Sequence, residues 1–162
     1  TGNTVTQVKE RWQEDALQVN PDVLSILIGI NDICKNIALF DGMVPWGLSV
    51  EELIAQYEAD YRYILTAAVK HNPNLKIIMM EPFIFPVTEK AKEARPYLDA
   101  MIPVVRKLAK EFGARLVPLD GIMMSAFAQK GDDEFWVEKD GVHPTLTGHA
   151  VIAKHWLKTA FR

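Results

Sequence analysis

The residues best suited to chemistry lie near the carboxyl end of the chain, where Asp140 and His143 are separated by Gly141 and Val142. An Asp-Gly pair favours a tight turn, because glycine adopts positive φ without steric cost. Pro144 disfavours helical dihedrals at His143. A carboxylate this close can accept a hydrogen bond from one imidazole nitrogen and leave the other as a base. Taken alone, the spacing is equally compatible with a surface turn that contains a histidine.

Three apolar segments alternate with helical patterns and must position this loop. The strand segments are residues 23–28, 75–80 and 115–119, and the first is a nearly continuous β-favouring run typical of a strand covered on both faces. Thr4 with Gln7 and Ser49 with Glu52 form capping boxes that start two helices. Apolar periodicity predicts helices over about 4–17, 49–71, 96–112, 122–129 and after 145, with residues 33–48 irregular.

This alternation predicts an α/β fold, a three-layer α/β/α doubly wound parallel sheet built by residues 1–162 as a single domain. Ligands of such folds bind outside the carboxyl ends of the strands. Asn31 and Asp32 follow the first strand and Glu81 follows the second. We therefore expect the loop with His143 to return to this edge of the sheet.

The number of predicted strands is small for this architecture. Open doubly wound sheets usually carry about five strands, with the first strand central. A sheet without that strand would leave a long apolar edge unpaired, which proteins avoid. We therefore expect a strand-helix-strand segment to precede residue 1 in the natural protein.

Composition excludes several classes of function. A net charge of −3 provides no basic field for nucleic acid or an anionic membrane. The longest apolar run, residues 23–30, is too short to span a bilayer, and the start of the chain does not resemble a signal peptide. Cys34 is the single cysteine, so no internal disulfide can form, and we expect it to be buried. A cytoplasmic location is expected over a secreted one, although the expected missing start leaves the compartment open.

Three motifs together carry a family resemblance. Three segments resemble blocks II, III and V of the SGNH (GDSL-type) hydrolases. They are Thr1-Gly2-Asn3-Thr4 with Gly2, Gly29-Ile30-Asn31-Asp32, and Asp140-Gly141-Val142-His143-Pro144. Their order and rough spacing agree with that family over the whole chain. The sequence looks most similar to bacterial carbohydrate esterases, including acetyl-xylan-type deacetylases.

The resemblance implies a role for each residue. His143 would act as general base and then general acid, and Asp140 would orient its imidazole. The Gly2 backbone N–H and the Asn31 side-chain amide would form an oxyanion hole. Gly29 would support this edge, and Asp32 is expected to be a buried hydrogen-bond anchor for the active-site loops rather than a catalytic carboxylate. No cofactor or metal is implied, and His149 and His155, six residues apart, do not share a helix face.

The family's nucleophile segment is absent from the chain. Ser25 lies within a predicted strand, Ser49 is a helix cap, and Ser125 lies in an apolar helix, so none is expected on a turn. We therefore expect the serine upstream of residue 1, and we expect the isolated chain to be inactive.

Four further side chains are candidates for substrate contact. They are Trp136, which is the first choice, and Trp46, Phe83 and Val142. Aromatic residues also fill cores, so a structural role competes with this interpretation.

Two functions of different class remain. The first is a serine ester hydrolase for small acyl esters such as acetylated carbohydrate. The second is a non-catalytic carbohydrate-binding or assembly module on the same fold. The expected partner is a small-molecule or carbohydrate ester, with no nucleic acid and no membrane, and a homo-oligomer is compatible with the exposed aromatic residues.

Overall fold

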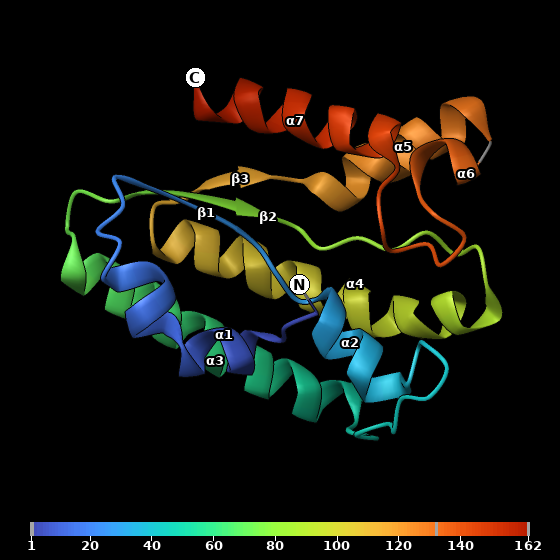
Figure 1. Ribbon diagram of the computed structural model, residues 1–162, viewed down its shortest axis with the longest axis horizontal. Coiled ribbons are helices and arrows are strands. Elements are labelled where there is room, and N and C mark those ends of the chain that lie inside the picture. The colour runs from blue at the N-terminus through green and yellow to red at the C-terminus, as the bar shows by residue number, and fades with distance from the viewer. Residues whose placement is uncertain (1, 132, 162) are drawn as a thin grey trace.

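The computed structural model describes residues 2–131 and 133–161, which form three layers (Figure 1). The middle layer is a parallel sheet whose three described strands follow the order β1-β2-β3. These strands are β1 (Val23–Leu27), β2 (Lys76–Met80) and β3 (Arg115–Val117). The predicted α/β class with helices on both faces of a parallel sheet is confirmed.

Helices cover the two faces unequally, as Figure 1 shows. One face carries α1 (Val5–Glu10), α2 (Ile30–Ile37), α3 (Val50–His71) and α4 (Glu89–Glu111), with a π-helical turn η1 (Gln13–Leu17) after α1. The other face carries α5 (Leu119–Lys130), α6 (Asp133–Trp136) and α7 (Leu146–Ala160). None of the described helices is both long and apolar enough to cross a bilayer.

Helix starts follow local side-chain chemistry. Both predicted capping boxes form, because Thr4 accepts from the Gln7 N–H and Ser49 from the Glu52 N–H, and each partner side chain bonds back to the cap. Thr145 caps α7 by accepting from the Gly148 N–H. These caps set where α1, α3 and α7 begin, and so where the preceding loops end.

Several predicted boundaries are wrong. The strand expected over 115–119 ends at Val117, and the helix expected over 122–129 already begins at Leu119. Residues 33–48 are not irregular throughout, because α2 occupies Ile30–Ile37 and only the residues after it form a loop. Helix α4 begins at Glu89 rather than Pro96, since Thr88 caps it by accepting from the Ala91 N–H. Pro96 and Pro103 both lie inside α4. At α2, the polar Asn31 and Asp32 obscured a helix start that comes directly after the strand.

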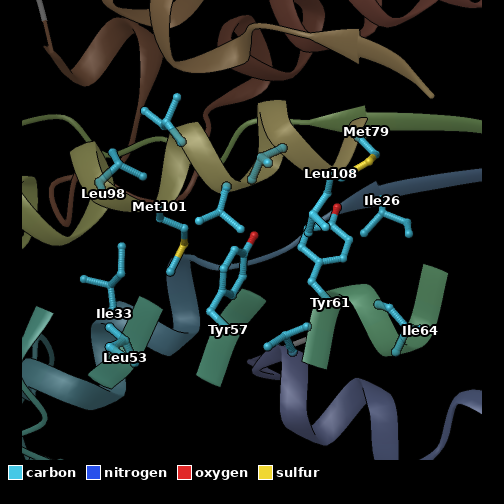
Figure 2. Packing of buried hydrophobic residues seen from close by; sticks show 14 of the residues in the cluster. Ile26, Ile33, Leu53, Tyr57, Tyr61, Ile64, Met79, Leu98, Met101 and Leu108 are labelled. Carbon is cyan, nitrogen blue, oxygen red and sulfur yellow. The ribbon is translucent and has the colours of Figure 1, made fainter. Parts of the chain in front are cut away.

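The larger core lies between the sheet and the layer of α1 to α4 (Figure 2). Ile26 and Met79 from the strands meet Tyr61 of α3 and Leu108 of α4 in this cluster. A smaller core packs Ile78, Met80 and Val117 against α5 and α7. Alternate side chains of the strands therefore pack into the two helical layers. This packing holds the carboxyl edge of the sheet between the layers.

The outer edge of β1 is open. In the described part of the chain β1 pairs with β2 alone, and Val23 and Leu27 are 47% and 41% exposed. The expectation that this strand is covered on both faces is therefore wrong for the residues described. Across this edge the Trp156 indole of α7 donates to the Ser25 hydroxyl over 2.8 Å.

Candidate active site

Asp140 and His143 meet as the sequence predicts. The Asp140 Oδ2 atom lies 2.7 Å from His143 Nδ1. Its other oxygen accepts from the backbone N–H groups of Val142 and His143 at 2.8 and 3.0 Å. Burial acts to raise the pKa of the Asp140 carboxyl, but these hydrogen bonds and the imidazole outweigh burial and lower that pKa. Asp140 therefore stays ionised and holds Nδ1, so Nε2 is the ring nitrogen left for proton transfer.

The loop with this pair rests on the segment that follows β2. The Phe85 N–H donates to the Gly141 carbonyl over 2.9 Å. Gly141 has φ +77°, and a Cβ there would lie 2.5 Å from the Phe85 carbonyl oxygen. Val137 and Pro144 form an isolated antiparallel bridge that closes the loop. The loop thus returns to the carboxyl edge of the sheet, as Figure 1 also shows between α6 and α7.

Asn31 lies in the first turn of α2, immediately beyond β1. The turn between them depends on Gly29, which has φ +128° and would place a Cβ 2.5 Å from Met101 Sδ and 3.0 Å from Tyr57 Oη. Met101 and Tyr57 lie side by side in the core (Figure 2). Tyr57 also donates to the Ile28 carbonyl over 3.0 Å. A glycine is therefore required here, since both the backbone angle and the close packing exclude a side chain.

Asp32 connects this turn to the start of the chain. Its carboxylate is 3% exposed and accepts the Val5 N–H at 3.2 Å through Oδ1 and 3.1 Å through Oδ2. Val5 is the first residue of α1, and Gly2 lies three positions before it. The segment with Gly2 is thus held beside the first turn of α2, where Asn31 lies. Gly2 itself is exposed and has φ +73°.

An open apolar pocket of about 230 Å³ lies at the carboxyl ends of β1 and β2. It brings together two of the four candidate contact residues, Phe83 and Val142. Its other walls come from the end of β1, the start of α2, the Asp140 loop and α7, namely Leu27, Ile28, Ile30, Pro82, Pro144, His149 and Ile152. Ile30, Val142 and Pro144 are chain neighbours of Asn31 and His143, and a small apolar group could lie in this pocket.

The other two candidate residues lie elsewhere. Trp136, in α6, packs edge-on against Phe135 and lines a groove between α5 and α7. Trp46 is 48% exposed and donates its backbone N–H to Lys35 near the end of α2. The structure therefore does not bring Trp136 and Trp46 to the pocket beside Asn31.

Phe40 is a site residue that the sequence reasoning missed. Its ring centroid lies 6.3 Å from that of His143, with the planes 34° apart. The loop carrying it is pinned where it leaves α2, since Ala38 has φ +50° and its carbonyl accepts from Lys90 Nζ over 3.1 Å. No local motif marks Phe40, because it is separated from His143 by more than a hundred positions.

The three serines and the cysteine lie in other surroundings. Ser25 accepts from Trp156, Ser49 caps α3, and Ser125 lines the groove between α5 and α7. Cys34 is fully buried, and burial raises the pKa of its thiol to about 12. Among the described residues, no three His, Cys, Asp or Glu side chains converge in the manner of a metal site.

Comparison with known proteins identifies the family of the chain. Residues 1–151 match the model of the GDSL-like lipase/acylhydrolase family. The chain belongs to that family. It is 30% identical over 160 residues to an acetylxylan esterase of Geobacillus stearothermophilus, covering 98% of this chain and 68% of that protein. As a GDSL-family member it is expected to share an esterase or acylhydrolase chemistry with this relative.

Solved structures show the same similarity. A GDSL-like lipase of Parabacteroides merdae superposes with a TM-score of 0.81 at 34% identity, covering 98% of this chain and 69% of that one. The acetylxylan esterase Axe2 of G. stearothermophilus superposes with a TM-score of 0.80 at 28% identity, covering 100% and 69%. Catalytic mutants of Axe2 replace a serine, an aspartate and a histidine, the last two spaced three positions apart.

Proposed function

We propose that this GDSL-family chain is the larger part of a serine ester hydrolase that uses His143 and Asp140. The observation that carries the proposal is the 2.7 Å contact between Asp140 Oδ2 and His143 Nδ1 at the carboxyl edge of the sheet. It fixes the imidazole tautomer and would stabilise the imidazolium that forms during reaction. The same three-residue spacing separates the aspartate and histidine replaced in the catalytic mutants of Axe2.

The reaction has two halves. His143 Nε2 takes the proton from a serine hydroxyl, whose oxygen attacks the ester carbonyl carbon and forms a tetrahedral intermediate. The intermediate collapses to an acyl-serine, and the departing alcohol takes the proton back from His143. A water molecule then repeats the sequence and releases the carboxylic acid. The Gly2 N–H and the Asn31 amide would donate to the oxyanion in both halves.

The nucleophile is proposed to come from residues outside these 162. In Axe2, the serine lies a certain number of positions before the aspartate. That number is larger than the number of residues that precede Asp140 in this chain. The open edge of β1 offers a surface against which such a segment can pack. The 162-residue chain by itself is therefore expected to hydrolyse no ester.

The substrate is proposed to be a small acyl ester, such as an acetyl group on a carbohydrate. The support is similarity to an acetylxylan esterase along nearly the whole chain. The pocket of about 230 Å³, with its apolar walls, is compatible with a short acyl group. Axe2 is described as an acetyl-xylooligosaccharide esterase, and that substrate class is the one to test first.

The decisive experiment compares His143→Ala with His71→Ala in the complete gene product. Hydrolysis of p-nitrophenyl acetate and of an acetylated xylo-oligosaccharide is expected to fall about 10⁴-fold or more in His143→Ala. His71→Ala, an exposed histidine at the end of α3, serves as the matched control and is expected to retain activity.

Intact mass and labelling by a fluorophosphonate complete the test. A mass above the 18.3 kDa of this chain, with labelling, supports a serine hydrolase. Unchanged hydrolysis in His143→Ala would overturn the proposal. A matching mass with no labelling and no hydrolysis would favour the non-catalytic carbohydrate-binding or assembly module.

A further inference from the structure

The feature that the reaction scheme leaves unexplained is the bond between Asp32 and Val5. Val5 is the first residue of α1, and its N–H is one of the helix donors that lack a partner within the helix. Thr4, the N-cap, is already engaged with Gln7. The Val5 N–H is satisfied instead by a carboxylate 27 positions away, which is 3% exposed. Such a long-range cap ties two segments together rather than only starting a helix.

A second contact ties the same two helices. Lys35 Nζ of α2 donates to Gln7 Oε1 over 2.8 Å, and that oxygen also accepts the Thr4 N–H over 3.1 Å. The two contacts therefore join the start of α1 to α2 at its first and second turns. One lies next to Asn31, and the other lies on the cap that follows Gly2 and Asn3.

We propose that Asp32 is a positioning residue which, through Val5, sets the separation between the Gly2 segment and the Asn31 side chain. This inference rests on the proposed function, because it assigns both groups to one oxyanion hole. Donors of such a hole act only when they lie about 2.7–3.1 Å from the developing oxyanion. A shift of about 1 Å in a positioned group can cost on the order of a hundredfold in rate. The Asp32 carboxylate itself touches no reacting atom.

The charge on Asp32 adds a pH dependence to this geometry. Burial is the main reason that the pKa of the Asp32 carboxyl is raised to about 7, and Asp60 on α3 adds to it. The same pKa is lowered by the N–H groups of Val5 and Asp32 and by Lys35 on α2. The pKa values of Tyr57 and Cys34, which also face Asp32, are raised mainly by burial, so both stay uncharged.

The expected consequence follows from the sign of that shift. Above about pH 7 the carboxylate is ionised and accepts strongly from Val5, whereas below it the protonated carboxyl accepts more weakly. The acid side of the kcat profile should therefore contain an ionisation that belongs to Asp32. If Asp32 had only a structural role, Asp32→Asn would change stability without altering the number of ionisations in the dependence of kcat on pH.

The first experiment measures kcat and KM against pH in the complete protein for wild type, Asp32→Asn and Asp60→Asn. In Asp32→Asn we expect kcat to fall about 10–100-fold with KM within twofold, and one ionisation to disappear from the acid side. Asp60 is the matched control, since it is also buried but accepts from Thr6 and Lys9 of α1 rather than from Val5. Asp60→Asn should retain this ionisation, displaced to lower pH because Asp60 no longer raises the pKa of Asp32. An Asp32→Asn profile that matches wild type would overturn the inference.

Val5→Pro tests the same contact from the other side. Proline is favoured at the first position of a helix and lacks the N–H, and the extended Thr4 (φ −86°, ψ 167°) suits the residue before a proline. This variant should therefore show the same loss of kcat and the same simplified profile. Combined with Asp32→Asn it should lose no more than either variant alone, whereas fully additive losses would contradict the inference.

A spectroscopic measurement separates this inference from the proposed function. In NMR spectra of the isotope-labelled protein, the Val5 amide and the Asp32 carboxyl carbon should titrate together near pH 7. If His143→Ala retains activity, the proposed function fails, and this titration still reports whether Asp32 controls Val5. A Val5 amide that does not respond to pH between 5 and 9 would contradict the inference by itself.

Discussion

The two halves of the candidate site are built in opposite ways. In the Asp140 half the carboxylate makes its hydrogen bonds within three residues, and the His143 side chain is 62% exposed. Longer-range contacts, from Phe85 to Gly141 and from Phe40 to His143, support this loop from outside. The Asn31 half is assembled from contacts 27 or more positions apart, between Asp32 and Val5, Lys35 and Gln7, and Tyr57 and Ile28. Its key carboxylate is buried. The Asp140 half can therefore lose its function without affecting the fold, whereas the Asn31 half cannot.

The largest expected effect separates activity from stability. Asp140→Asn removes the negative charge that fixes the imidazole tautomer, so kcat should fall about 10⁴-fold in the complete protein. Because Asp140 is held by its own loop, thermal unfolding should shift little. A loss of folding comparable to the loss of activity, measured by circular dichroism, would show that the two halves are coupled more tightly than their contacts indicate.

The Asn31 half should respond in the opposite manner. Gly29→Ala meets Met101 Sδ at 2.5 Å and holds a strained φ of +128°, so the free energy of unfolding should fall by about 2–4 kcal/mol. Gly42→Ala is the control, because Gly42 also has positive φ (+81°) but no atom lies within 4 Å of its Cβ position. Urea unfolding of the two variants should differ clearly. Equal losses would mean that packing around Gly29 contributes nothing beyond backbone strain.

The smallest effect tests the long-range ring contact between Phe40 and His143 in the Asp140 half. Phe40→Ala removes a ring contact with His143 worth about 1 kcal/mol, which corresponds to roughly a fivefold fall in kcat. Phe40→Leu, which keeps an apolar side chain, should recover part of the loss. Phe161→Ala, at an exposed position after α7, should leave kcat unchanged. A change confined to KM would instead place Phe40 against the substrate.

The same contrast explains what could be predicted from sequence. Asp140 and His143 were predictable because the turn, the proline and the hydrogen bonds all lie within five consecutive residues. The capping boxes of α1 and α3 were predictable for the same reason. The parallel sheet followed from the alternation of elements, and the family model then confirmed the resemblance.

Other features depend on contacts between residues far apart in the sequence, which no local pattern indicates. Asn31 and Asp32 read as polar loop residues, but they open α2 because Gly29 turns the chain between Met101 and Tyr57. Pro96 read as a helix start, although Thr88 caps α4 two turns earlier. Phe40 reaches His143 only through the tertiary fold. The roles of Gly2, Asn31, Trp46 and Trp136 toward a substrate stay predictions.

The hydrogen bond between Trp156 and Ser25 provides an intrinsic optical probe of the exposed sheet edge. The indole of Trp156 lies over the edge strand whose Val23 and Leu27 are open to solvent. Indole emission shifts to shorter wavelengths as its surroundings become dry, so docking of a segment along β1 should be visible as a blue shift. Trp156→Phe would identify that signal among the four tryptophans and would allow the rate of edge closure to be followed in a stopped-flow fluorimeter.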